Sequence, residues 1–167
     1  MTNSDLQAAF QNRLEQHKKI LYKVCNAYCK DRDSREDLAQ EITFQLWRSF
    51  GKFDGRCQFS TWMYRIALNV AISFYRSEGT RTRHVIADER RLLEWVVETD
   101  REPEEVRLLY EFIEELNPLS KALILPHLDG NTYPEIAGIV GISETNVATK
   151  ISRLKSKMKQ EFGTRKV

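Results

Sequence analysis

The segment FSTWMYRIALNVAISFYRSE, residues 59–78, carries side chains that could contact nucleic acid. On a helical wheel, one arc is apolar and consists of Met63, Ile66, Ala67, Val70 and Phe74. The adjoining arc carries an aromatic ring, an amide and two guanidinium groups: Trp62, Arg65, Asn69, Ser73 and Arg76. Aromatic rings stack on unpaired bases and Arg binds phosphates, so this arc is a candidate surface for single-stranded nucleic acid. The alternative is that Trp62 and Tyr64 are ordinary core aromatics.

A second candidate is TYPEIAGIVGISETNVATKISRLKSKMK, residues 132–159. Thr132 and Glu135 have the spacing of a capping box, and Pro134 suits a first helical turn. Gly141 permits a tight turn, after which Ser143 can cap a second helix. Ile136, Ala137 and Val140 are expected to face inward from the first helix, and Val147, Ile151, Leu154 and Met158 from the second. This layout is typical of a helix-turn-helix, whose second helix enters the DNA major groove.

The outward face of that second helix carries short polar groups near its start and basic groups further along. Hydroxyl and amide side chains suit base edges, and Lys and Arg suit phosphates. The expected contacts are Thr145, Asn146, Thr149, Lys150, Arg153 and Lys157, and Lys155 is a further residue that suits a phosphate. The alternative is a plain helical hairpin with a solvated basic face.

The helix expected from about Ser34 to Phe50 has an acidic side. Asp33, Asp37, Glu41 and Arg48 line one polar face, and Glu36 and Gln40 border it. A face rich in carboxylates repels DNA, which predicts a basic protein surface as its partner. A solvated helix face remains the alternative.

Helical periodicity runs through most of the chain and positions these candidates. Helices are expected over 6–28, 34–50, 59–78 and 104–127, followed by two short helices around Gly141, and 51–58 (GKFDGRCQ) is a loop. We therefore predict an all-α fold of two small helical domains, 1–78 and 105–162, joined by a flexible acidic linker, 79–104, and followed by a basic tail, 163–167. Pro126 predicts a kink or break in its helix.

Composition narrows the class of protein. The 167 residues are 30% charged, with net charge +2. That total hides an acidic segment, 88–115, with 11 acidic and 4 basic residues, and a basic end, 150–167, with 7 basic and 1 acidic. No apolar run approaches the roughly 20 residues of a membrane span, and the N-terminus has no signal-peptide core, so a cytoplasmic location is expected. The three cysteines, Cys25, Cys29 and Cys57, lack zinc-site spacing and are expected to be reduced and partly buried. No metal or cofactor is expected.

Two blocks of sequence together resemble a known family. DSREDLAQEITFQLWR, followed by FDGRCQFSTWMYRIALN, is similar to region 2 of bacterial sigma factors of the extracytoplasmic-function (ECF) type. NPLSKALILPHLDG, continuing through the helix-turn-helix, resembles their region 4. The resemblance covers most of the chain, in the family's order.

The resemblance implies a role for each candidate face. The acidic helix would dock on the clamp coiled coil of the largest RNA polymerase subunit through Asp33, Glu36, Asp37, Gln40 and Glu41. The loop 53–59 would capture a flipped base of the −10 element, and the helix after it would hold the melted strand; together they supply Phe53, Arg56, Phe59, Trp62, Tyr64, Arg65, Asn69 and Arg76. The helix-turn-helix would read the −35 element. Family members are commonly held inactive by an anti-sigma factor, which is the further partner expected here.

Two other functions are alternatives to a sigma factor. A stand-alone helix-turn-helix regulator would use the N-terminal bundle to dimerise and would bind duplex DNA without polymerase. An adaptor that binds proteins through amphipathic helices would leave the basic C-terminal face unexplained. An enzyme is not expected, because the three His residues are scattered and no phosphate loop, nucleophile elbow or metal-ligand spacing occurs.

Overall fold

The computed structural model describes residues 2–77 and 103–165. Within these ranges the chain is all-helical, with eight α-helices and no strand, which confirms the expected fold class. The helices are α1 (Asn3–Gln16), α2 (Lys18–Tyr28), α3 (Arg32–Phe50), α4 (Phe59–Arg76), α6 (Glu104–Glu114), α7 (Pro118–Leu128), α8 (Tyr133–Val140) and α9 (Glu144–Arg165). The expected linker, 79–104, lies almost entirely outside the described residues.

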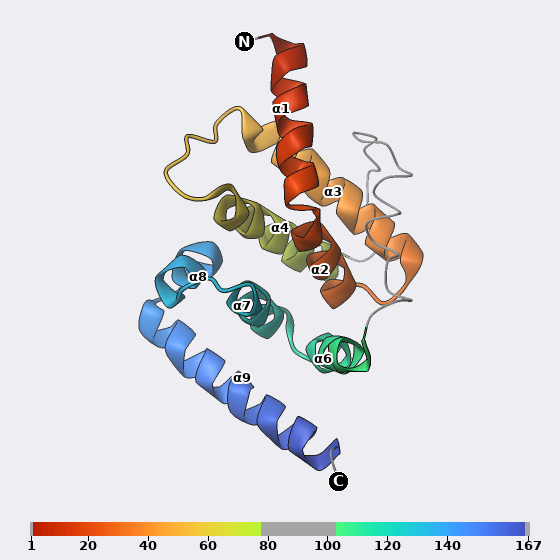
Figure 1. Cartoon of the computed structure of the whole chain (residues 1–167), viewed down its shortest axis with the longest axis vertical. Helices are drawn as coiled ribbons and strands as arrows, with labels where there is room; N and C mark the ends of the chain where they lie inside the picture. The colour runs from red at the N-terminus through yellow and green to blue at the C-terminus, as the bar shows by residue number, and fades with distance from the viewer. Residues whose placement is uncertain (1, 78–102, 166–167) are drawn as a thin grey trace.

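Helices α1 to α4 form an N-terminal bundle, drawn from red to olive in Figure 1. Leu21, Val24, Leu38, Ile42 and Leu46 are fully buried at its centre, where α2, α3 and α4 pack together. The prediction of a single helix over 6–28 is wrong, because the helix is interrupted at residue 17. There His17 leaves helical geometry at φ −119° and ψ 19°, ending α1 and beginning α2.

Helices α6 to α9 form a C-terminal module. The single helix expected over 104–127 is also wrong, because it is divided by a capping signal. The Asn117 side chain accepts a hydrogen bond from the Ser120 backbone N–H at 2.8 Å, and Pro118 occupies the first position of α7. A kink or break is expected at Pro126, and no break occurs there because α7 continues through this residue. This proline lies within α7, which ends two residues later, and its carbonyl accepts from the Asn131 backbone at 3.0 Å.

The two modules pack against each other rather than standing apart. In Figure 1, α7 and α8 lie beneath α4 and α2, and α9 runs along the outer side of the C-terminal module. Buried side chains of both modules belong to one continuous hydrophobic cluster. Tyr28 of α2 donates its hydroxyl to the Pro118 carbonyl of α7 at 2.7 Å. The described helices are therefore joined in one closed arrangement.

The cysteines agree in part with expectation. Cys25 and Cys29 are buried in and just after α2, Cys57 is exposed in the loop before α4, and all three are free thiols. None of the described helices has the length and apolar character needed to cross a membrane.

Candidate nucleic-acid interface

The loop 51–58 and the start of α4 are held by a cluster of aromatic rings. Phe59 is 4% exposed and lies at the centre, with ring centroids 5.7 Å from Phe53 and 5.2 Å from Trp62. Phe50 packs on the same ring at 6.3 Å, and the Arg13 guanidinium lies over it at 5.7 Å. Phe59 is therefore not available on the surface in this arrangement, and its predicted contact with DNA stays a prediction. Phe59 instead supports Phe53 and Trp62, which are both partly exposed.

The outer arc of α4 is formed as the wheel predicted. Arg65, Asn69 and Arg76 are exposed along one side of the helix. At its N-terminal end lies Arg56 of the loop, whose side chain is 90% exposed and pairs with Asp54 at 3.0 Å. The arrangement combines partly exposed rings with exposed cations, which suits an unpaired strand: the rings can stack on bases and the cations can neutralise phosphates.

Tyr64 does not belong to this arc. Its side chain is fully buried, and its hydroxyl donates a hydrogen bond to the Asp129 carboxylate at the end of α7. Burial and this hydrogen bond both raise the pKa of the phenol. The wheel identified one buried stripe on α4, but Tyr64, Leu68 and Ala71 are buried as well. Tyr64 is therefore part of the contact between the modules, not a DNA-facing residue in this state.

The helix-turn-helix is built from the local signals expected. Thr132 and Glu135 form the capping box, with the Glu135 backbone N–H donating to the Thr132 hydroxyl at 3.3 Å. Gly141 ends α8 at φ 80° and ψ 34°, a left-handed conformation that only glycine adopts cheaply. Ser143 then accepts from the Asn146 backbone at 3.2 Å and caps α9. The buried positions of α8 are Ile136 and Ile139, whereas Ala137 and Val140, expected inside, are only partly buried.

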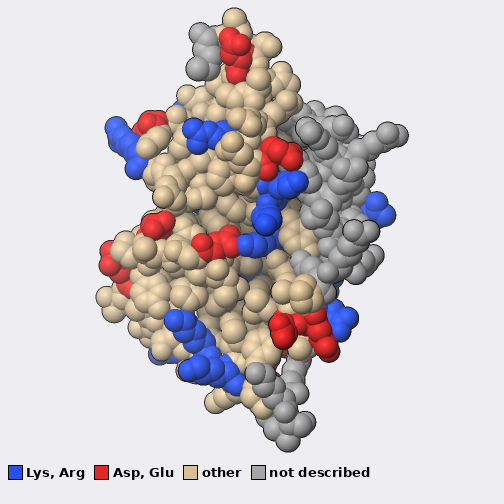
Figure 2. All heavy atoms as spheres, viewed as in Figure 1, with Lys and Arg blue, Asp and Glu red and all other residues tan. Residues whose placement is uncertain are grey.

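The expected reading face of α9 points outward. Val147, Ile151 and Leu154 are buried, and Met158 is partly buried against the core, as the sequence predicted. The six residues opposite are all exposed except Lys150, which is partly buried: Thr145, Asn146, Thr149, Lys150, Arg153 and Lys157. The Thr149 hydroxyl also donates to the Thr145 carbonyl at 3.0 Å, so it is oriented by the helix backbone. Figure 2 shows Lys and Arg side chains gathered over α9.

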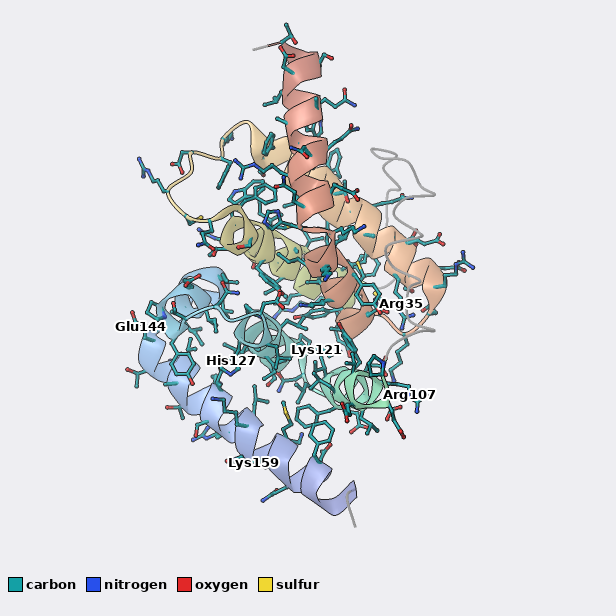
Figure 3. The ribbon with its side chains drawn as sticks, in the orientation of Figure 1. Arg35, Arg107, Lys121, His127, Glu144 and Lys159 are labelled. Carbon is teal, nitrogen blue, oxygen red and sulfur yellow. The ribbon has the colours of Figure 1, made fainter. Side chains whose placement is uncertain are left out.

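Lys155 lies on a different side of α9. Burial lowers the pKa of the His127 imidazole on α7, and the positive charge of Lys155 lowers it further. Figure 3 labels His127 on α7, facing α9. Arg153 and Lys155 are both exposed cations two positions apart, but successive helical residues turn by about 100°, so they point away from each other.

The acidic side of α3 is only partly available. Asp33 is exposed, Glu36, Asp37 and Glu41 are partly buried, and Gln40 is 5% exposed. Glu36 pairs with Arg32 at 3.4 Å, and Glu41 accepts from the Gln45 amide at 3.2 Å. Gln40 is therefore not on the surface in this state, contrary to expectation. The carboxylates around it still give α3 one acidic side.

The fold and these faces define a two-module, all-helical protein in which a helix-turn-helix accompanies an aromatic and basic surface. Residues 14–91 match the Sigma-70 region 2 family, and residues 107–158 match the Sigma-70, region 4 family. The chain belongs to the sigma-70 family, as a promoter-recognising sigma factor of the ECF type. Both modules match in family order, which does not favour a stand-alone regulator. Sigma factors are initiation factors and not enzymes themselves.

Curated relatives agree with this placement. The ECF RNA polymerase sigma-E factor of Escherichia coli (strain K12) is 32% identical over 129 residues, which is 70% of this chain and 68% of the relative. The ECF RNA polymerase sigma factor SigX of Bacillus subtilis (strain 168) is 25% identical over 156 residues, covering 86% of this chain and 78% of the relative.

Solved structures share the fold. CnrH in complex with the cytosolic domain of CnrY has a TM-score of 0.65 and 21% identity, covering 95% of this chain and 90% of that one. The sigma factor RpoE in complex with the anti-sigma factor NepR, from Bartonella quintana, has a TM-score of 0.68 and 17% identity, covering 91% of this chain and 95% of that one.

Proposed function

We propose that this sigma factor binds the −10 element through the loop 51–58 and α4, and the −35 element through α9. The observation that carries the −10 assignment is the aromatic cluster beside an exposed polar arc. Phe53 and Trp62 present partly exposed rings, and Arg65 and Asn69 follow them along α4. An unpaired base can stack on such rings at ~1–3 kcal/mol each, which offsets the cost of removing it from the duplex.

The −35 assignment rests on the capped second helix of the helix-turn-helix. Thr145 and Asn146 lie in its first turn, where short polar groups reach base edges in the major groove. Arg153 and Lys157 lie about two and three turns further on and are exposed. They would contact phosphates and set the register of the helix on the duplex.

Core RNA polymerase would dock on the acidic side of α3. The residues proposed for this contact are Asp33, Glu36, Asp37 and Glu41, which together give a carboxylate surface that a basic helical hairpin would complement. Gln40 would join the interface only after a rearrangement that exposes it. Such docking would place the chain in the cytoplasm, with the transcription machinery and with no catalytic step of its own.

A protein that covers these faces would act as an anti-sigma factor. Support comes from the two structural relatives, both described in complex with another protein: the cytosolic domain of CnrY and the anti-sigma factor NepR. The proposed partner would block the acidic side of α3, the α4 arc, or both.

Reconstituted transcription tests these assignments. The chain is mixed with bacterial core polymerase and fragmented genomic DNA of its host, and transcript starts are mapped. The α3 assignment would be supported by discrete transcript starts that require the chain, that are lost with Asp37→Arg and that persist with the control Glu105→Arg. Glu105 is a suitable control because it is an exposed carboxylate of α6 outside every proposed interface. Protein-dependent starts that are insensitive to Asp37→Arg would refute it. Absence of protein-dependent starts, alongside duplex binding without polymerase, would favour a stand-alone regulator.

Trp62→Ala provides the second arm of the same experiment. We expect less transcript from a fully paired linear template and a normal amount from a template that is already unpaired at the −10 position. The second template no longer needs Trp62 to hold the strand during melting. Equal loss on both templates would assign Trp62 to stability instead.

A further inference from the structure

One side of α1 borders the aromatic cluster at the loop 51–58. The Arg13 guanidinium lies 5.7 Å from the centroid of the Phe59 ring, and the centroid of the His17 ring lies 5.0 Å from it. Phe10, on the same side of α1, packs on Phe50 at the end of α3, with 5.3 Å between their ring centroids. In Figure 1, α1 runs past the end of α3, where the loop begins. Helix α1 therefore adjoins the surface proposed to hold the unpaired strand.

The position of Arg13 is fixed by its neighbours on α1. Phe10 and Leu14, both 3% exposed, hold the helix against the N-terminal bundle. At the end of α1, the His17 Nδ1 donates a hydrogen bond to the Arg13 carbonyl at 2.9 Å. The Arg13 side chain is exposed, and among the described residues no carboxylate pairs with it. Its guanidinium therefore keeps N–H donors for a ligand that comes from outside.

The Arg13 guanidinium is within reach of a strand that stacks on the partly exposed rings. The ring centroids of Phe53 and Trp62 lie 5.7 and 5.2 Å from that of Phe59. The guanidinium is therefore at most about 11 Å from either ring, because the separations through Phe59 add to no more than this. An unpaired strand advances 3.4 Å or more per nucleotide, so Arg13 lies within about three nucleotides of a base stacked on these rings.

The chemistry around Arg13 suits a phosphate better than a base. Phe59, the ring beneath the guanidinium, is 4% exposed and offers little surface on which a base could stack. A guanidinium donates two parallel hydrogen bonds to one phosphate group. Arg56, the cation of the loop, already pairs with Asp54 at 3.0 Å. Arg13 is thus a cation at the edge of the aromatic cluster that meets no carboxylate within the described part of the chain.

The comparison with the region 2 family does not cover Arg13. The match begins at residue 14, so most of α1 precedes it. The proposed −10 surface consists of the loop 51–58 and α4, and it contains no residue of α1. A contact made by Arg13 would therefore be added to that surface.

We propose that Arg13 is a further DNA-binding residue, which contacts a phosphate of the unpaired strand within about three nucleotides of the base held by Phe53 and Trp62. Helix α1 thereby extends the −10 surface. This inference rests on the proposed function, which places the unpaired strand on these two rings. The alternative is a structural role, in which Arg13 only supports the Phe59 ring.

The test couples Arg13 to single phosphates. The full chain and bacterial core polymerase are bound to a labelled template from the mapped starts that is unpaired at the −10 position. One phosphate at a time, in either unpaired strand, is replaced by an uncharged methylphosphonate, and fluorescence anisotropy over a KCl series measures affinity. Arg13→Gln should weaken binding to the unmodified template about five- to tenfold and reduce the salt slope by about 0.7. One methylphosphonate should abolish the difference between Arg13→Gln and the parent chain.

Two further variants complete the test. Arg13→Lys keeps the charge but not the planar fork, so it should keep the parental salt slope and bind more weakly than the parent. The matched control, Arg107→Gln, removes an exposed guanidinium from α6, which Figure 3 labels, and it should bind like the parent. Circular dichroism melting establishes that each variant is folded, and Arg13→Lys takes the place of Arg13→Gln in the phosphate scan if the latter unfolds.

Two results would overturn the inference. Arg13→Gln could bind like the parent, or its loss of affinity could persist with every methylphosphonate, which would confine Arg13 to supporting Phe59. Arg65→Gln, from the exposed arc of α4, tests the proposed function on the same templates. If Arg65→Gln couples to a phosphate and Arg13→Gln does not, the inference fails and the −10 assignment stands. If neither Arg65→Gln nor Trp62→Ala changes binding, the −10 assignment fails, and the inference with it.

Discussion

Removing one basic side chain from the outer face of α9 should change the salt dependence of DNA binding by a calculable amount. Arg153 is exposed on the face proposed to contact phosphates. Lys155, two residues on, is also exposed but lies on the side that acts on His127. Arg153→Gln and Lys155→Gln therefore remove the same charge from opposite sides of one helix.

The magnitude follows from counterion release. If Lys150, Arg153 and Lys157 each neutralise one phosphate, the logarithm of the binding constant should fall with the logarithm of salt concentration at a slope of about −2.7. Affinity should then drop ~40-fold between 50 and 200 mM salt. Arg153→Gln should leave a slope of about −1.8 and a drop of ~12-fold. Lys155→Gln should retain the parental slope.

Fluorescence anisotropy of the whole chain with a labelled duplex, over a series of KCl concentrations, measures both slopes. Equal slopes for the two variants would refute the proposed orientation of α9, because long-range charge alone does not distinguish the sides of the helix. A change confined to Lys155→Gln would place DNA on the side of α9 next to α7.

Three further predictions concern the folded state. Gly141→Ala should lower the free energy of unfolding by about 1–2 kcal/mol, because alanine is strained at φ 80°. The same change should weaken duplex binding by misplacing α9. Urea unfolding measures the first effect and fluorescence anisotropy the second, and an unchanged urea midpoint would contradict the predicted strain. The free energy of unfolding should fall as pH rises above 10, because burial raises the pKa of Tyr28 and Tyr64 above the ordinary value of 10.0 for a tyrosine. The unfolded chain therefore loses these protons first. Urea midpoints from pH 9 to 11 measure this effect, and a flat profile would exclude it. Lys121→Met should increase the free energy of unfolding at pH 7, as measured by urea unfolding. Burial disfavours the charged ammonium and lowers its pKa, whereas a methionine side chain fills similar space with no charge to bury. A large decrease would instead show that the contacts of Lys121 with the Tyr28 and Tyr75 rings are the dominant effect.

The sequence predicts the helices and the helix-turn-helix well because their signals are local. The capping box of Thr132 and Glu135, the glycine turn and the Ser143 cap are each made within four residues, and the structure contains all of them. The missed breaks had local causes too. Asn117 followed by Pro118 is a helix-start signal that could have divided the helix expected over 104–127, whereas no comparable side-chain cap marks the break at His17.

The role of Tyr64 could not be read from periodicity. A helical wheel shows which residues share a side, but it does not show how many sides are covered. α4 is covered on one side by α2 and α3 and on another by the C-terminal module, so both of those sides are buried. The partner of Tyr64 lies 65 residues away in the chain, and no spacing rule connects them.

The arrangement divides the surface of α4 among three roles. One side builds the N-terminal core, Tyr64 fixes the C-terminal module, and Arg65, Asn69 and Arg76 remain exposed. The outer face of α9 is exposed as well. Glu135 of α8 adjoins the loop before α4, and its carboxylate accepts a hydrogen bond from the Thr61 hydroxyl at 3.4 Å. The two proposed DNA surfaces therefore differ in their surroundings: the loop before α4 borders a carboxylate of the C-terminal module, whereas the outer face of α9 is exposed.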